Sequence, residues 1–439
     1  MSTGYDFNHY LLAGHGRAYI ISKENPELYR DRIMSACRKD YTFDMQCEGS
    51  RAFLTYDLVS LFDDPEPFIA AAEESYADPA TDENWKQLCH LTDLLLLLGR
   101  RETVIRKYKH IEKQLYSGVP LSDLSSLCES FEYLALTLIQ KKSINVLGTV
   151  MNDIGRWFLS RTEDPQELKP WFMWFDSVSE EEFGKNRYNE ALTLGKSTEG
   201  VEEYIRIMST PLKCERKEQA DKPTAEIVLS WIREKPDISR LEMMTRGLMK
   251  MNASEAKKLA EYFSIEADQD IKAGIVSVFT SGKYRWPLDI TLLTNCIDSA
   301  SKRLVDQANT ALALLKGDRL HDYAKDLLEK GFNPDAIIIL INNIKAEDGL
   351  FVMKYLEQLP VTNENEESWH SIVSAIVHNG NGPDFPISLL YWAYEASLCS
   401  VCREGIVKAL MNRNHLPDQY REEMQWDANL DIRNMVGNK

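Results

Sequence analysis

Two cysteines near the end of the chain have the spacing of a redox or metal-binding pair. Cys399 and Cys402 form a C-x-x-C motif, which is a redox pair in a thioredoxin-like setting and a zinc site when a second pair is present. The sequence holds no second pair of this kind, and no predicted strand precedes it. Because cysteine is among the most buried residue types, we interpret the two as small core residues and predict no metal site.

A second group near the N-terminus gathers imidazole, guanidinium and glycine in one loop-like window. Histidine can act as a base or ligand, and arginine can bind phosphate or carboxylate through two hydrogen bonds. The window lacks the later Gly and the Lys with Ser or Thr of phosphate-binding loops, so we expect a structural cap on a first helical repeat. Its residues are His9, Tyr10, Gly14, His15, Gly16, Arg17 and Tyr19.

A basic run stands out against an acidic background. Arg106, Lys109 and Lys113 share one helical face, where an acidic peptide, a phosphate group or a nucleic-acid backbone can dock. Glu102 and Glu112 partly neutralise the run, and a solvated helix face is the simpler interpretation. The partner-binding candidates in this run are Arg100, Arg101, Arg106, Lys109 and Lys113.

Four aromatic residues after Pro170 form the densest aromatic cluster of the chain: Trp171, Phe172, Trp174 and Phe175. One stripe of a helix cannot bury all four, because these positions span most of two faces. Some of them must meet a second surface, which is an adjoining repeat, the joint between the two halves of the chain, or a protein partner. We favour internal packing, since aromatic side chains bury large areas, and keep all four as partner-binding candidates.

No motif for catalysis or for cofactor binding occurs in the chain. It contains no H-E-x-x-H, Walker, G-x-S-x-G or kinase signature. We therefore predict a protein that is not an enzyme, with no catalytic residues and no cofactor. A catalytic site assembled from distant repeats would leave no local signature, and this alternative stays open.

The elements that position these residues are predicted to be helices. Apolar residues at helical spacing recur about every 33 residues in the second half of the chain, a period typical of stacked helix pairs. The first helices of the pairs carry stripes around Ile275, Leu312, Ile376 and Leu410, and the second helices carry stripes around Leu327, Tyr355 and Leu390. The β-branched run 337–341 resembles a buried strand, but it is in phase with the repeat and we predict a helix.

A single helical hairpin cannot bury its apolar stripe, so neighbouring hairpins must stack. Glycines and prolines such as Gly317, Gly331, Pro334 and Pro417 separate the stripes, as helix ends require. The predicted fold class is all-α, an α-solenoid of stacked hairpins.

Three stretches resemble the HEAT and armadillo class of helical repeats. They are 303–315, with Ala308, Ala311 and Leu312; 403–410, with Ala409 and Leu410; and 51–58, followed by Asp63, Asp64, Pro65, Glu66 and Pro67. Asp431, Ile432 and Arg433 resemble the start of one more unit. The resemblance implies a superhelix with a concave binding surface. A tetratricopeptide type competes, because the period also suits it, although the Trp, Leu, Gly and Tyr framework is missing.

Two regions are expected, a less regular one over 1–215 and a HEAT-like one over 216–439. The polar stretch from Ser209 through Cys214 to Pro223 is the candidate joint. One continuous superhelix is an equally good alternative.

Composition limits the partners and the location. The formal net charge is −17, which disfavours duplex nucleic acid or an anionic membrane as the main partner. No apolar run approaches the roughly 20 residues of a membrane span, and the N-terminus has no secretion signal. The eight cysteines are scattered, unlike a disulfide scaffold, so we expect a cytoplasmic protein.

These observations favour a scaffold or adaptor that binds another protein or a peptide on the concave face of the superhelix. The alternative is a helical-repeat protein that binds or acts on nucleic acid through the basic run from Arg100 to Lys113. A third option, a subunit of a multi-subunit bacterial sensor or immunity-type system, depends on analogy between scaffold folds alone.

Overall fold

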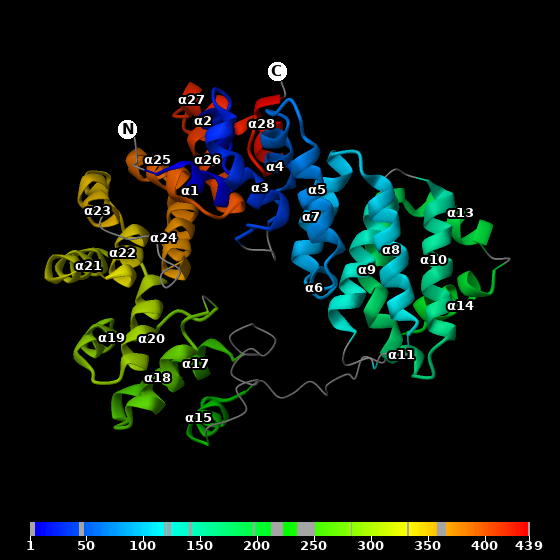
Figure 1. Ribbon diagram of the computed structural model, residues 1–439. Coiled ribbons are helices and arrows are strands. Elements are labelled where there is room, and N and C mark those ends of the chain that lie inside the picture. Colours follow the sequence, from blue (N-terminus) through cyan, green and yellow to red (C-terminus); the bar gives the residue numbers. More distant parts are fainter. Residues whose placement is uncertain are drawn as a thin grey trace. The chain divides into compact units, whose positions relative to one another are not determined.

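The computed structural model is helical throughout the part it describes (Figure 1). The described residues are 5–43, 48–117, 120, 124–139, 143–195, 198–211, 223–234, 251–281, 283–331, 333–357 and 366–437. Within these ranges every regular element is an α-helix or a short 3-10 helix, and there is no strand. The predicted all-α class is therefore confirmed. Most of the candidate joint, residues 212–222, lies outside the described ranges.

The chain packs as two compact units. Unit 1 comprises residues 1–214 together with 398–401 and 417–439, and unit 2 comprises residues 215–397 and 402–416. Unit 2 is thus inserted, in sequence, between segments of unit 1. The C-terminal residues belong to unit 1, although their sequence resembles a further repeat of the C-terminal region.

Unit 1 is formed by the helices of the N-terminal half and the last two helices of the chain. They are α1 (Phe7–Leu12), α2 (Arg17–Ser22), η1 (Pro26–Tyr29), α3 (Arg30–Arg38), α4 (Ala52–Val59), α5 (Glu66–Ala77), α6 (Ala80–Glu83), α7 (Trp85–Leu97), α8 (Arg101–Leu115), α9 (Ser125–Ile139), α10 (Ile144–Leu159), α11 (Pro165–Leu168), η3 (Lys169–Phe172), α12 (Met173–Phe183), α13 (Lys185–Gly195), α14 (Glu199–Ser209), α27 (Asp418–Met424) and α28 (Leu430–Gly437).

The helices of unit 1 pack in a regular order. Helix α3 contacts α5, α5 contacts α7, and α7 contacts α9. The buried residues of α7 include Leu88, Leu91 and Leu95 and extend to other positions of residues 88–95, because neighbouring helices cover more than one face of α7. Each of these helices packs against the next but one along the chain, as expected for stacked hairpins.

The two ends of the chain meet inside unit 1, where α27 contacts α2 (Figure 1). The Arg17 guanidinium forms a two-point ion pair with Glu423, with Nε to Oε1 at 2.7 Å and Nη2 to Oε2 at 3.1 Å. The ring of Tyr19 stacks on Trp426 at 3.8 Å between centroids. The N-terminal window is therefore the docking site of the C-terminal helices, which explains its residue types better than a simple cap does.

Glycine is required where these segments approach. A Cβ on Gly16 would lie 1.8 Å from the carbonyl oxygen of Glu423. Gly14 has a φ of +65°, and a Cβ there would lie 2.6 Å from Cδ of Arg51. A larger residue at Gly16 would require a backbone shift, and one at Gly14 would strain the left-handed backbone and displace the Arg51 side chain. The two glycines of the window therefore serve packing.

Unit 2 holds the helices of the second half of the chain. They are α15 (Ala225–Arg233), α17 (Ala253–Ile265), α18 (Gln269–Ser277), α19 (Thr291–Thr294), η4 (Asn295–Asp298), α20 (Lys302–Ala313), α21 (Asp318–Lys330), α22 (Pro334–Asn342), η5 (Ala346–Asp348), α23 (Gly349–Leu356), α24 (Glu366–Asn379), α25 (Ile387–Ala396) and α26 (Ser400–Asn412), of which the first two residues of α26 belong to unit 1.

Successive even-numbered helices of unit 2 form a ladder in which α18 contacts α20, α20 contacts α22, and α22 contacts α24. Asparagine side chains link its steps. Asn342 Nδ2 donates to the carbonyl of Ala313 at 2.7 Å, and Asn379 Nδ2 donates to Asn342 Oδ1 at 2.7 Å. The stripes predicted for the first helices, around Ile275, Leu312, Ile376 and Leu410, fall on α18, α20, α24 and α26, and those predicted for the second helices fall on α21, α23 and α25. The 337–341 run is helical, as predicted. No helix in the described ranges has the length and apolar character of a membrane span.

Candidate partner-binding surface

The aromatic cluster divides between the core and the surface. Phe172 and Phe175 are fully buried, Trp171 is half-buried, and Trp174 is 51% exposed. Met173 beside it is 42% exposed. The preference for internal packing is correct for the two phenylalanines and wrong for Trp174.

Helical geometry explains this division. Phe172 ends η3 and Phe175 lies three residues on in α12, so both point inward while the two residues between them point outward. The Phe172 ring contacts Trp157 and Phe158 edge-on, with centroid distances of 5.3 and 5.7 Å. These contacts anchor the start of α12 in the core of unit 1.

Polar contacts fix the same segment. Lys169 Nζ donates to the carbonyls of Met208 and Thr210 at 2.6 and 2.8 Å. The backbone N–H of Phe175 donates to Glu132 Oε1 at 3.0 Å. Burial raises the pKa of the Glu132 carboxyl to about 8, because a charged carboxylate is disfavoured away from water. Met173 and Trp174 are thus presented on a rigid base.

Acidic side chains follow the exposed pair along α12. Glu180, Glu181 and Glu182 are exposed, and Glu181 lies two turns after Trp174, on the same helix face. Asp176 faces inward instead, where its Oδ1 accepts hydrogen bonds from Tyr188 and, at 2.6 Å, from Tyr204. The surface formed by Met173, Trp174 and Glu180–Glu182, called here the α12 surface, is apolar at one end and negative at the other.

Part of the basic run is paired with carboxylates. Arg100 contacts Glu66 at 2.7 Å, and Lys109 contacts Glu112 at 2.9 Å and Asp153 at 3.3 Å. Lys107 is buried and paired with Asp82. This pairing reduces the positive potential that an anionic partner would meet.

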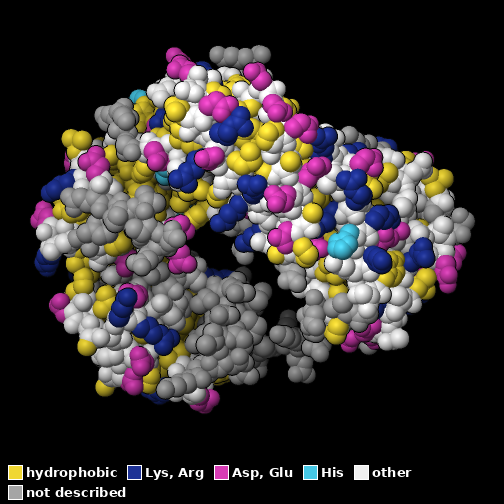
Figure 2. Space-filling model, in the orientation of Figure 1, with side chains coloured by type: hydrophobic (Ala, Val, Ile, Leu, Met, Phe, Trp, Pro, Cys, Tyr) yellow, Lys and Arg dark blue, Asp and Glu magenta, His cyan; other side chains and the backbone are white. Residues whose placement is uncertain are grey.

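The remaining basic candidates are Arg101, which is half-buried, Arg106, whose Nη2 donates to Thr103 Oγ1 at 3.0 Å, and the exposed Lys113. On the face drawn in Figure 2, Lys and Arg side chains are interspersed with Asp and Glu side chains over the described residues. The basic run lies on α8 and the residue before it, and the aromatic cluster lies on η3 and α12; these elements pack against α9.

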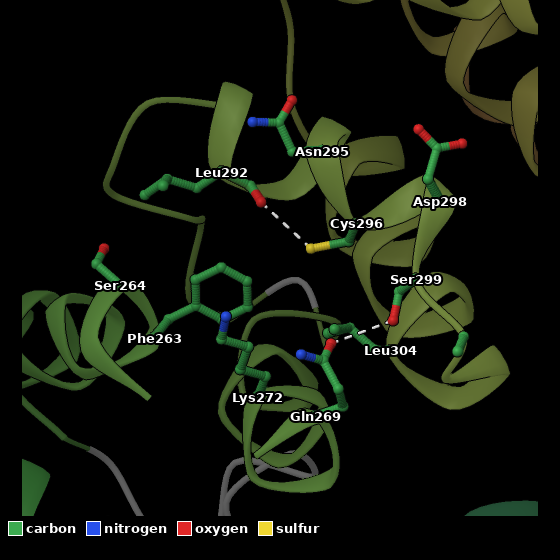
Figure 3. Close-up of a pocket in the computed structure, with 11 residues that line it drawn as sticks. Phe263, Ser264, Gln269, Lys272, Leu292, Asn295, Cys296, Asp298, Ser299 and Leu304 are labelled. Atoms are coloured by element: carbon green, nitrogen blue, oxygen red, sulfur yellow. Dashed lines mark hydrogen bonds between the residues drawn. The ribbon is translucent and has the colours of Figure 1, made fainter. Parts of the chain in front are cut away.

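A cavity of about 530 Å³ opens in unit 2 beside α18, η4 and α20 (Figure 3). Cys296 Sγ donates to the carbonyl of Leu292 at 3.2 Å, and the Lys272 amine lies 5.2 Å from the centroid of the Phe263 ring. Burial raises the pKa of the Cys296 thiol, which makes it a weak nucleophile. No motif pointed to this cavity, because its lining comes from several separate helices.

One histidine of unit 2 lies between two carboxylates, as catalytic histidines often do. His321 Nδ1 is 2.9 Å from Asp322 Oδ1, and Nε2 is 2.8 Å from Asp348 Oδ2. Lys325 Nζ also contacts Asp348, at 2.9 Å. Both ring nitrogens are therefore engaged within the protein, so this group fastens η5 to α21 and does not present a base to a substrate.

Comparison with protein-family models, curated proteins and solved structures finds no match to this chain.

Proposed function

We propose that this protein is a non-enzymatic helical-repeat scaffold that binds another protein through the α12 surface. The observation that carries the proposal is Trp174, which is half exposed on a segment that buried aromatic residues hold rigid. Tryptophan is enriched among the residues that dominate binding energy at protein interfaces. A rigid surface also lowers the entropy cost of binding.

The chemistry of the surface defines the partner. Met173 and Trp174 favour an apolar side chain on the partner, and Glu180, Glu181 and Glu182 favour lysine or arginine beside it. We therefore propose a protein or peptide that carries an apolar residue flanked by basic ones. We propose this local contact instead of the binding along the concave face of the superhelix that the sequence suggests.

The architecture proposed for the scaffold is a solenoid of HEAT- or armadillo-like repeats. The ladder from α18 to α24 supports it, as do the asparagine hydrogen bonds that join its steps. The packing of α3, α5, α7 and α9 follows the same rule. A cytoplasmic location, expected from the cysteine pattern, is part of the same proposal.

Affinity capture with matched variants tests this function. Trp174→Ala should weaken binding of the partner at least tenfold, a loss of about 1.4 kcal/mol or more in binding free energy, because truncation of a central tryptophan is among the most costly changes at an interface. Leu28→Ala, at a residue that is 72% exposed in the same unit, should leave capture unchanged. Nuclease treatment before capture should also leave it unchanged. Equal capture by both variants, or loss of the partner on nuclease treatment, would refute the proposal.

A further inference from the structure

Three side chains that bind soft metal ions converge at the start of α26. The Nδ1 or Nε2 atom of His370 and the Sγ atoms of Cys399 and Cys402 all lie within 4.8 Å of one another. Cys399 is buried, and the other two residues are half-buried. The sequence showed the cysteine pair but not the histidine, which lies on α24, some thirty positions earlier.

Local backbone geometry positions the two thiols. Cys399 directly precedes α26, and Cys402 is the third residue of that helix. Side chains three positions apart at a helix start lie on one face. Cys399 is also joined to Ser397 and to Cys402 by continuous backbone, so the local chain conformation sets its distance from both.

Packing of α24 brings the histidine to the same place. The Nε1 atom of Trp369, next to His370, donates to the carbonyl of Ala396 at 3.0 Å, three residues before Cys399. The rings of Trp369 and Trp392 pack with centroids 5.1 Å apart, which holds α24 against α25. These contacts hold the segment of α24 that carries His370 against the chain that leads to Cys399.

A buried arginine fixes the backbone just before the two cysteines. Arg403, which follows Cys402, is fully buried, and its Nη1 donates to the carbonyl of Ser397 at 3.1 Å. This hydrogen bond ties the start of α26 to the segment that leads into it.

We propose that His370, Cys399 and Cys402 bind one zinc ion. Two thiolates and one imidazole suit Zn²⁺, which prefers tetrahedral sulfur and nitrogen ligands. A tetrahedral zinc ion with Zn–S bonds of about 2.3 Å and Zn–N bonds of about 2.1 Å sets its ligand atoms roughly 3.3–3.8 Å apart. The ligand atoms of the three residues lie at most 4.8 Å apart, and small rotations of the side chains would bring them to these separations. Three protein ligands leave the fourth position to water or another exchangeable ligand.

Titration of the reduced, metal-free, full-length protein with Co²⁺, followed by Zn²⁺, tests this site. We expect one equivalent of Co²⁺ to bind with the absorption of thiolate-to-cobalt charge transfer, and one equivalent of Zn²⁺ to displace it. Cys402→Ser should abolish this absorption, and His370→Ala should weaken metal binding at least tenfold. Cys296→Ser removes a thiol outside the cluster and should leave both the charge-transfer absorption and the metal affinity unchanged.

Two results would overturn the proposal without depending on how the variants fold. The first is a wild-type titration with no saturable one-to-one binding. The second is an unchanged charge-transfer band in the double variant Cys399→Ser and Cys402→Ser, with circular dichroism confirming its helical content. Neither result bears on the α12 surface, so the zinc site and the partner contact are tested independently.

Discussion

At the scale of single residues, Glu132 connects the core of unit 1 to the α12 surface. Its carboxyl accepts a hydrogen bond from the backbone of Phe175, the residue after Trp174. The sequence did not reveal this role, because the hydrogen-bond partner of Glu132 is 43 positions away. Trp174 itself was named among the candidates, and helical geometry required that part of the aromatic cluster face outward. The packing of Phe172 against Trp157 and Phe158 determines which residues of the cluster face outward.

The raised pKa of Glu132 predicts a stability that depends on pH. Its folded-state pKa of about 8 is above its ordinary value of 4.5, so the folded protein binds a proton that the unfolded chain has lost between these values. The free energy of unfolding should therefore fall as pH rises from about 4.5 to 8, by at most about 1.4 kcal/mol per pH unit.

Urea unfolding at pH 5, 6, 7 and 8 measures this effect against Glu132→Gln, whose amide oxygen still accepts from Phe175. The stability of the wild type relative to this variant should decline across the series. Glu102→Gln, at an exposed position of α8, is the control and should retain the wild-type dependence of stability on pH. If the free energy of unfolding changed with pH equally in the wild type and in Glu132→Gln, the raised pKa of Glu132 would be contradicted.

At the scale of elements, helical periodicity predicted where helices occur but not which helices pack against each other. The β-branched run 337–341 was correctly predicted as helix, because its phase in the repeat outweighed its strand propensity. The pairing of α10 with α14 was not predicted. It depends on Gly155 and Gly200, and a Cβ on Gly155 would lie 1.6 Å from the Gly200 carbonyl oxygen. Close approach of two helices through small residues leaves little trace in an apolar pattern.

Gly155→Ala should therefore destabilise unit 1 by about 1–3 kcal/mol, since the added methyl group forces α10 and α14 apart. Gly148→Ala is a matched control on the same helix, where the nearest atom to an added Cβ is 3.8 Å away. That change should be neutral or stabilise by up to about 1 kcal/mol, because alanine is the better helix former. Thermal unfolding of both variants checks the prediction, and equal midpoints would show that the two glycines are not needed for close packing.

At the scale of the whole molecule, the chain begins and ends in the same unit. Arg17 and Glu423 are 406 positions apart, and Arg433 contacts Asp57 at 2.7 Å. The sequence placed the last helix in a further C-terminal repeat, because local pattern shows that a helix is amphipathic but not which surface it covers. Charged pairs this distant in sequence have no spacing rule from which they can be predicted.

Arg17→Met should destabilise unit 1 by about 3–5 kcal/mol, because it takes the guanidinium from a buried carboxylate. Arg38→Met removes an exposed ion pair with Glu74 and should cost less than about 1 kcal/mol. Limited proteolysis should release the C-terminal segment of the Arg17 variant first. Wild-type protection of that segment in Arg17→Met would contradict its anchoring by this pair.

The central claim is that a protein partner docks on the α12 surface, and crosslinking from inside that surface tests it most directly. A photoreactive amino acid would replace Ser177, an exposed residue of α12 between Trp174 and Glu181, in one protein and Leu28 in a control. Both would be irradiated in native lysate, with and without nuclease treatment. We predict one discrete protein adduct at position 177 under both conditions, mapped to a partner peptide with an apolar residue beside lysine or arginine, and none at position 28. The same adducts at both positions, or crosslinks to nucleic acid at position 177 in the untreated lysate, would contradict the account.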